Sequence, residues 1–399
     1  MNNTIYDFPM LKKEIIYFVN GATTFKPYQV IEAMNDYYAN YSANAHRGDY
    51  SISYKVDVAY ENTRKKVAEF INANFDEVVF TSGTTDSINM IVNGFFKNLL
   101  EEGDEILLTQ SEHASNVLPW FKLAKTNNCI IKYIDLDETL HVTLENVIAS
   151  ITPRTKVISI AGITNVVGDE RPIDEICKYA HANNIFVVID GAQLVPHKKV
   201  DVKKSDIDFL AFSGHKMCGP TGIGVLYGKK EFLEKFEPIN LGGGMNDSFD
   251  NENEVYLKDL PNRLEAGTPN IAGVIGLGAA VDYLNSIGMD KINEHEKKLK
   301  TYLIDKLIKL QFVDIINIES DSGIISFNID GIFSQDVAFY LNKYNICVRA
   351  GNHCAKILKN ATGVKNTIRV SLYFYNTYEE IDKFVELISD RERIMKEMI

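Results

Sequence analysis

The sequence predicts an α/β protein whose mostly parallel sheet is covered by helices on both faces, followed by a smaller α+β domain. Six short apolar runs alternate with longer helix-like segments, an order that is typical of parallel sheets. Continuous apolar runs of this length indicate strands that are buried on both faces. These runs are residues 77–80, 105–109, 156–160, 185–190, 207–212 and 224–227.

The pattern changes near Asp290, where the second domain is expected to begin. A charged helix over 290–310 is followed by a strand at 323–328, a helix at 335–344, strands at 346–349 and 367–372, and a charged helical end. We therefore expect residues 16–289 to form a large domain and residues 290–399 a small one. Residues 1–15 are expected to pack with the small domain. Residues 242–254, which contain three glycines, are predicted to be a loop.

One helix is indicated directly after the first predicted strand and the turn at residues 81–85. Its apolar residues follow the spacing of a single helical face, so we expect them to be buried together. They are Ile88, Ile91, Val92, Phe95, Phe96 and Leu99.

Composition excludes several classes of protein. The chain has 399 residues, 45% of them hydrophobic and 24% charged, with a net charge of −12. That balance argues against general binding to nucleic acid or to anionic membranes. No signal peptide and no apolar run of about 18 residues is apparent. The five cysteines include no CxxC pair, so we expect neither disulfides, nor a metal site, nor a location outside the cytoplasm.

Lys216 lies a few residues after a predicted strand, in the glycine-rich segment at residues 213–224. A lysine in a loop is ordinarily solvated. Here the glycines allow the backbone to approach a ligand closely, and Ser213 and His215 supply donors. A lysine in such a place can lose its charge and act as a covalent amine catalyst.

Two further positions follow strands. The turn containing Gly83, Thr84 and Thr85 precedes a helix and is either a phosphate site or an ordinary helix cap. Asp190 ends an apolar run, and Gln193 follows it. Ligands of open α/β sheets bind at this edge, where a carboxylate can face the protonated ring nitrogen of pyridoxal phosphate or merely cap a helix.

His113 and Cys354 are the candidate proton carrier and nucleophile. His113 is either a structural residue or an imidazole lying over a ring. Cys354 is flanked by polar and basic residues, which favours an exposed thiolate over a buried thiol. Arg349 and Arg369 lie in the neighbouring strands, where each could hold a substrate carboxylate or form a structural ion pair.

These segments together resemble the class V family of fold-type I pyridoxal-phosphate enzymes, and within it the group II cysteine desulfurases and selenocysteine lyases. The resemblance extends from Val19 to about Leu372 and preserves order and spacing. The matching segments are ANAHRG at 43–48, FTSGTTDSIN at 80–89, QSEHASNVLPW at 110–120, ITNVVG at 163–168, VVIDGAQLVPH at 187–197, FSGHKMCGPTGIGVLYGK at 212–229, RLEAGTPN at 263–270 and VRAGNHCA at 348–355.

The resemblance implies a seven-stranded sheet in the large domain, a homodimer, bound pyridoxal 5′-phosphate and a role for each site residue. Lys216 would bind the cofactor covalently, Asp190 would face its ring nitrogen, and His113 would stack on the ring. Cys354 would accept sulfur from L-cysteine as a persulfide. The remaining implied contacts are Asn165 and Gln193 near the ring oxygen, Thr84, Thr85, Ser213 and His215 at the phosphate with Thr268 of a second subunit, and Arg369, Asn165 and Ala22 at the substrate.

The chain departs from the family pattern at Gly21, Gly162, Cys218 and Asn352. Cys218 adds a second thiol close to the lysine in sequence. The resemblance also implies a sulfur-acceptor protein and a contribution to iron–sulfur cluster assembly. Three alternatives remain from the residues alone: a selenocysteine lyase, an aminotransferase or epimerase of the same class, and a non-catalytic scaffold that binds the cofactor.

Overall fold

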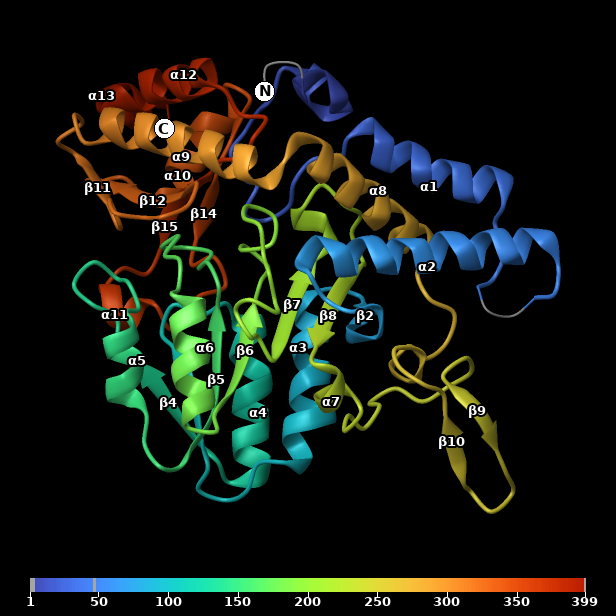
Figure 1. The fold of residues 1–399 in the computed structure, drawn as a ribbon. Coiled ribbons are helices and arrows are strands. Elements are labelled where there is room, and N and C mark those ends of the chain that lie inside the picture. Colours follow the sequence, from blue (N-terminus) through green and yellow to red (C-terminus); the bar gives the residue numbers. More distant parts are fainter. Residues whose placement is uncertain (1–3, 46–47, 398–399) are drawn as a thin grey trace.

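The structure is a computed structural model that describes residues 4–45 and 48–397. His46 and Arg47, which belong to the segment matched at 43–48, lie outside the described residues. A seven-stranded sheet dominates the first two thirds of the chain, as the resemblance implies (Figure 1). In spatial order its strands are β2 (Val78–Thr81), β8 (Gly224–Gly228), β7 (Phe209–Ser213), β6 (Phe186–Asp190), β5 (Thr155–Ala161), β3 (Glu105–Thr109) and β4 (Ile130–Ile134).

The sheet is parallel except for β8, which pairs antiparallel with both of its neighbours. Successive side chains of its strands enter separate cores: Ile106 and Leu108 pack on one face and Leu107 on the other. The helices of this part are α1 (Tyr28–Asn40), α2 (Ser51–Ile71), α3 (Thr84–Met90), α4 (Leu118–Asn127), α5 (Leu144–Ser150), α6 (Ile173–Ala182), α7 (Lys230–Leu233) and α8 (Ile271–Ile287). Both faces of the sheet are therefore covered, as predicted.

The C-terminal part contains a four-stranded antiparallel sheet of its own. Its order is β11 (Val313–Ile315), β12 (Ile324–Ile329), β15 (Thr367–Ser371) and β14 (Arg349–Gly351). The helices around it are α9 (Met289–Leu307), α10 (Ser334–Asn342), α11 (Lys359–Thr362), α12 (Tyr378–Ser389) and α13 (Arg391–Glu397). Near the other end of the chain, β1 (Ile16–Tyr17) pairs with β13 (Ile346–Cys347), and the Phe8 ring packs against Tyr283, Phe374 and Tyr375.

Helix α8 connects the two parts, and 12 of its 17 residues are buried. No described helix is by itself long and apolar enough to cross a membrane. The α8–α9 pair passes that test only jointly, with a 72° bend between the two helices.

Three local predictions are wrong. The helix after Thr85 is α-helical only to Met90, then forms a π turn at Ile91–Phe95 and a 3-10 turn at Phe96–Asn98. The π turn holds more residues than an α turn, so the register of the buried face changes and Leu99 is 43% exposed. The single strand predicted at residues 346–349 is two short strands, β13 and β14, which belong to different sheets.

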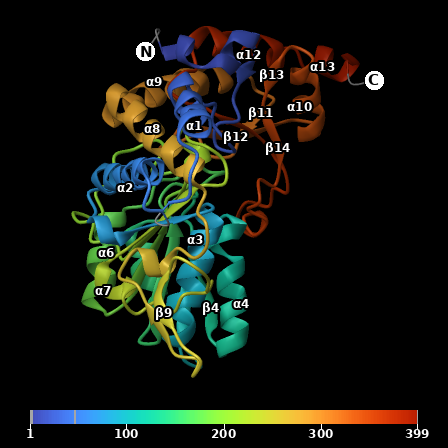
Figure 2. The same ribbon diagram turned by 90° about the vertical axis from the view of Figure 1, so that its right-hand side faces the viewer.

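Residues 242–254 are not a plain loop, because β9 (Asn246–Phe249) and β10 (Val255–Leu257) form an antiparallel hairpin. Figures 1 and 2 show this hairpin projecting from the body of the protein. Its strands are exposed; the first, NDSF, is mostly polar, and the second, VYL, is too short to resemble the apolar runs that identified the core strands. The edge strand β4 was also not predicted, although its sequence, IIKYI, is apolar except for Lys132.

Close backbone packing at the end of β8 positions the turn that carries Thr84. A Cβ at Gly224 would lie 2.4 Å from Gly83 Cα and 2.8 Å from Gly83 N. Because backbone atoms cannot withdraw as a flexible side chain can, we expect Gly224→Ala to lower the free energy of unfolding by about 1–3 kcal/mol, as overpacking does.

Urea denaturation with Gly242→Ala as the control tests this, since a Cβ at Gly242 meets nothing closer than 3.8 Å. Equal denaturation midpoints for the two variants would contradict the packing argument.

Candidate active site

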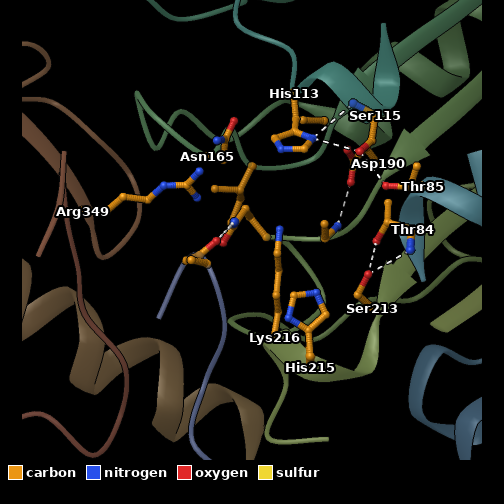
Figure 3. A pocket seen from close by; sticks show the side chains of 16 residues that line it. Thr84, Thr85, His113, Ser115, Asn165, Asp190, Ser213, His215, Lys216 and Arg349 are labelled. Atoms are coloured by element: carbon orange, nitrogen blue, oxygen red, sulfur yellow. Dashed lines mark hydrogen bonds between the residues drawn. The ribbon is translucent and has the colours of Figure 1, made fainter. Parts of the chain in front are cut away.

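A cavity of about 180 Å³ opens at the carboxyl ends of β5, β6 and β7. Figure 3 shows Lys216 between Arg349 on one side and the hydroxyl residues Thr84, Thr85 and Ser213 on the other. The cavity brings together most of the predicted site residues, which come from segments far apart in the sequence. Its predicted members are Ala22, Thr84, Thr85, His113, Asn165, Asp190, Gln193, Ser213, His215 and Lys216.

Lys216 enters the cavity because β7 ends at Ser213 and a short 3-10 turn, Gly214–Lys216, redirects the chain. No described residue forms a hydrogen bond or ion pair with its amine. Desolvation lowers the pKa of Lys216 to about 8, and Arg369 and Arg349 act in the same direction against the opposing charge of Asp190. The amine is therefore more readily deprotonated, and so more nucleophilic, than an ordinary lysine.

Asp190 is the last residue of β6 and is 4% exposed. Its Oδ1 accepts a hydrogen bond from the Ala192 backbone N–H at 2.9 Å. Burial raises the pKa of the carboxyl, while the Lys216 charge opposes that rise. A buried carboxylate in this position is stabilised by a cationic partner, which the protonated nitrogen of a heterocycle provides.

His113 lies at the opposite wall and caps a 3-10 turn, Ala114–Asn116. Its Nδ1 accepts from the Ser115 backbone N–H at 3.2 Å, which places the proton of the neutral ring on Nε2. Burial and the charge of Lys216 lower the pKa of His113 to about 4. The imidazole is consequently neutral near pH 7 and carries no charge toward the cavity.

Hydroxyl groups gather at the end of the cavity nearest α3. The Ser213 hydroxyl accepts from the Thr84 backbone N–H at 2.8 Å and lies 2.7 Å from Thr84 Oγ1. Thr85 Oγ1 lies 2.7 Å from the hydroxyl of Ser115, a cavity residue that the sequence reasoning missed. This set of donors suits a phosphate group. The sequence signal for Ser115 was its position two residues after His113.

Several polar groups around the cavity lack a partner among the described residues. In a protein core such groups are normally hydrogen-bonded, so unpaired ones indicate a binding site for a polar ligand. Gln193 Nε2 donates to the Gly21 carbonyl, but its Oε1 is unpaired. Asn165 Nδ2 donates to the His353 carbonyl, but its Oδ1 is unpaired. The unpaired oxygens, the buried carboxylate and the hydroxyl cluster together fit pyridoxal phosphate.

Cys354 lies at the rim and does not line the cavity. Its thiol is exposed, and the Nη2 of Arg349, a cavity residue, lies 3.7 Å from its Sγ. The Cys354 carbonyl accepts from the Ala114 backbone N–H at 2.9 Å, which ties the cysteine segment to the turn that carries His113. The thiol therefore lies next to Arg349, and its backbone is bonded to the residue that follows His113.

Three other predicted residues lie outside the cavity lining. Arg369 is fully buried and donates from Nη1 to the Asn165 carbonyl, so it supports the wall while Arg349 lines it. Thr268 accepts from Asn44 Nδ2 at 3.5 Å and is not part of the lining of this chain's own cavity. Cys218, the second thiol near the lysine in sequence, is fully buried, and burial raises its pKa to about 12, so it is not an available sulfur nucleophile.

The lowered pKa of Lys216 makes a prediction for cofactor uptake. Only the neutral amine attacks an aldehyde, so the rate at which cofactor-free protein recombines with pyridoxal phosphate is expected to rise with pH, with a midpoint near 8. Stopped-flow absorbance measures that rate. A midpoint near that of an ordinary lysine, about 10.4, would show that the cavity does not perturb the amine.

Comparison with known proteins adds the family context. The model of the aminotransferase class-V family matches residues 16–384. A probable cysteine desulfurase of Halalkalibacterium halodurans is 43% identical over 381 residues, 94% of each chain. One from Staphylococcus aureus is 40% identical over 396 residues, 97% of this chain and 96% of the relative.

Two solved structures share the whole fold. The cysteine desulfurase of Thermococcus onnurineus superposes with a TM-score of 0.94 at 37% identity, over 99% of this chain and 98% of that one. The cysteine desulfurase CsdA of Escherichia coli gives a TM-score of 0.93 at 34% identity, over 100% and 98%.

Proposed function

We propose, from the premise that the chain belongs to the class-V aminotransferase family, that it is a pyridoxal-phosphate-dependent cysteine desulfurase. It converts L-cysteine to L-alanine and transfers the sulfur to Cys354 as a persulfide. One observation carries this proposal: a cavity with a weakly basic lysine and a buried carboxylate has an exposed cysteine at its rim, joined to it through Arg349.

The cofactor would be held by residues that surround the cavity. Lys216 would bind its aldehyde carbon, Asp190 would face its ring nitrogen, and Thr84, Ser213 and His215 would hold its phosphate. When bound, pyridoxal phosphate supplies an electron sink for the pair released from the substrate Cα. Neutral His113 suits the ring face, because it adds no positive charge that would compete with the protonated ring nitrogen for Asp190.

The side chains of this chain then divide the work. Because its pKa is lowered to about 8, the Lys216 amine loses its proton more readily than an ordinary lysine, and its neutral form would remove the proton from the substrate Cα. The guanidinium of Arg349 faces the cavity and Arg369 lies behind it, so the substrate carboxylate has a cationic wall.

Sulfur transfer requires the Cys354 thiolate, since a thiol is a poor nucleophile. The thiolate attacks the substrate sulfur, a sulfur–sulfur bond forms, and the bond between the substrate sulfur and Cβ breaks. The bonding pair stays with the carbon fragment, which takes up protons and leaves as alanine. Arg349, whose Nη2 donates to Sγ, stabilises the negative charge on the nucleophile.

Assembly and location remain proposals. A homodimer is supported by Thr268, which does not line its own cavity and would complete the phosphate site of a second copy. A sulfur-acceptor protein would take the persulfide from the exposed thiol onward to iron–sulfur cluster assembly. A cytoplasmic location is supported by the five cysteines, all of which are free.

Replacing the nucleophile separates cofactor binding from sulfur transfer. We expect Cys354→Ala to retain bound cofactor but to lose persulfide formation and at least about 100-fold in alanine production, since removing the nucleophile removes its step. Alanine and sulfide are assayed with L-cysteine, with and without reductant. Cys129→Ser is the control, because Cys129 lies between α4 and β4 and its thiol donates to the Glu101 carbonyl. Full persulfide formation by Cys354→Ala would reject the assignment.

Subunit mixing tests whether Thr268 acts across a dimer. Lys216→Ala and Thr268→Ala each impair their homodimers. In a mixed dimer with Thr268 acting across the interface, one cavity carries both changes and the other carries neither, so about half of the wild-type activity returns. Recovery absent from a purified mixed dimer, or a chain that stays monomeric in sedimentation, would contradict the proposal.

A further inference from the structure

Three side chains far from one another in sequence meet away from the cavity. His141 Nε2 lies 3.6 Å from Asp169 Oδ1 and 3.3 Å from Asp321 Oδ2. One possible ligand atom from each residue lies within 4.8 Å of the others. His141 precedes α5, Asp169 lies between β5 and α6, and Asp321 lies between β11 and β12. The group thus joins the large sheet's loops to the C-terminal sheet.

Asp169 is an independent sign that a cation belongs here. Its side chain is fully buried, and its Oδ1, the oxygen that faces His141, accepts no hydrogen bond from any described residue. The other oxygen is paired with Arg171 and lies 3.4 Å from the Val142 backbone N–H. Arg171 balances the charge of this carboxylate through the other oxygen, but a buried oxygen without a hydrogen bond costs free energy, so Oδ1 is open to a further ligand.

The orientation of His141 leaves its Nε2 free for a ligand. Thr139 Oγ1 donates its single hydrogen to Asp137 Oδ1 at 2.8 Å. It therefore accepts at 2.8 Å from His141 Nδ1, which must carry a proton. Nε2 then faces two carboxylates, so a cation placed among these three groups would contact one ligand atom of each. An outer bond from the other ring nitrogen is the usual support of a metal-binding histidine.

The surroundings favour a doubly charged cation. The hollow beside His141 is lined by acidic side chains and by no lysine or arginine among the described residues. Its acidic members are Asp137, Glu145, Glu175, Glu319 and Asp321. Arg171 is already paired with Asp169, and a divalent cation would add two positive charges beside the remaining acidic side chains and contact Asp169 Oδ1 directly.

We propose that His141, Asp169 and Asp321 bind a divalent transition-metal cation through one nitrogen and two carboxylate oxygens, with water at the remaining positions. The imidazole ligand favours manganese or zinc over magnesium or calcium, which prefer oxygen ligands alone. Bound there, the ion fixes the loop between β11 and β12 against the loops of the large sheet. Cysteine spacing predicted no metal site, and this site escaped that search because it contains no cysteine.

Manganese is the probe, because it binds oxygen and imidazole and has little affinity for the thiol at the active-site rim. The holoenzyme, freed of excess cofactor, is titrated with Mn²⁺ while electron paramagnetic resonance measures the free ion. We expect one Mn²⁺ per chain for the wild type and at least about tenfold weaker binding for Asp321→Asn and for His141→Gln, since each removes one ligand.

Asp314→Asn is the matched control, because Asp314 is an exposed carboxylate on β11 that lies outside the cluster. It removes the same charge from the same hairpin, and we expect its Mn²⁺ affinity to equal that of the wild type. Two results would overturn the proposal: no stoichiometric binding by the wild type at millimolar Mn²⁺, or an equal loss in Asp314→Asn and Asp321→Asn, which would indicate only a diffuse negative field.

Discussion

The proposed chemistry depends on the electrostatic balance between the Lys216 amine and the Asp190 carboxylate in a desolvated cavity. Burial works against the charged form of both groups, lowering the pKa of Lys216 to about 8 and raising that of Asp190. Their mutual attraction opposes each shift, which leaves an amine that deprotonates near neutral pH beside a carboxylate that still attracts a cation. Adjacent strands create this balance, because β6 ends at Asp190 and β7 leads into the turn of Lys216.

The same balance explains why the rest of the cavity is built as it is. A charged His113 would add a second cation beside Lys216, and its lowered pKa keeps it neutral. Arg369 and Arg349 also lower the pKa of the lysine, and we propose that they bind the substrate carboxylate. The exposed Cys354 lies next to one of them, so the nucleophile and the carboxylate site share a source of positive charge.

Much of the fold and most of the cavity were predictable from sequence, for reasons that differ by residue. The apolar runs 105–109 and 185–190 identified core strands because burial on both faces removes polar residues from them. Lys216 and Asp190 were recognisable because each follows such a strand. Neither Thr268 nor Ser115 follows an apolar run: the role proposed for Thr268 needs a second copy of the chain, and Ser115, whose sequence signal is its position two residues after His113, contacts Thr85 and His113. The hairpin β9–β10 and the π turn after Met90 depend on backbone pairing and register, to which an apolar pattern is blind.

The central claim is that Lys216 and Cys354 act on one bound amino acid. A crystal structure of the holoenzyme with Cys354→Ser and L-cysteine bound tests it directly. We predict that the Lys216 amine lies within about 4 Å of the substrate Cα, and that the residue 354 hydroxyl lies within about 4 Å of the substrate sulfur. A structure in which the side chain of residue 354 lies in a separate cavity, out of reach of that sulfur, would contradict a joint action of Lys216 and Cys354 on one substrate.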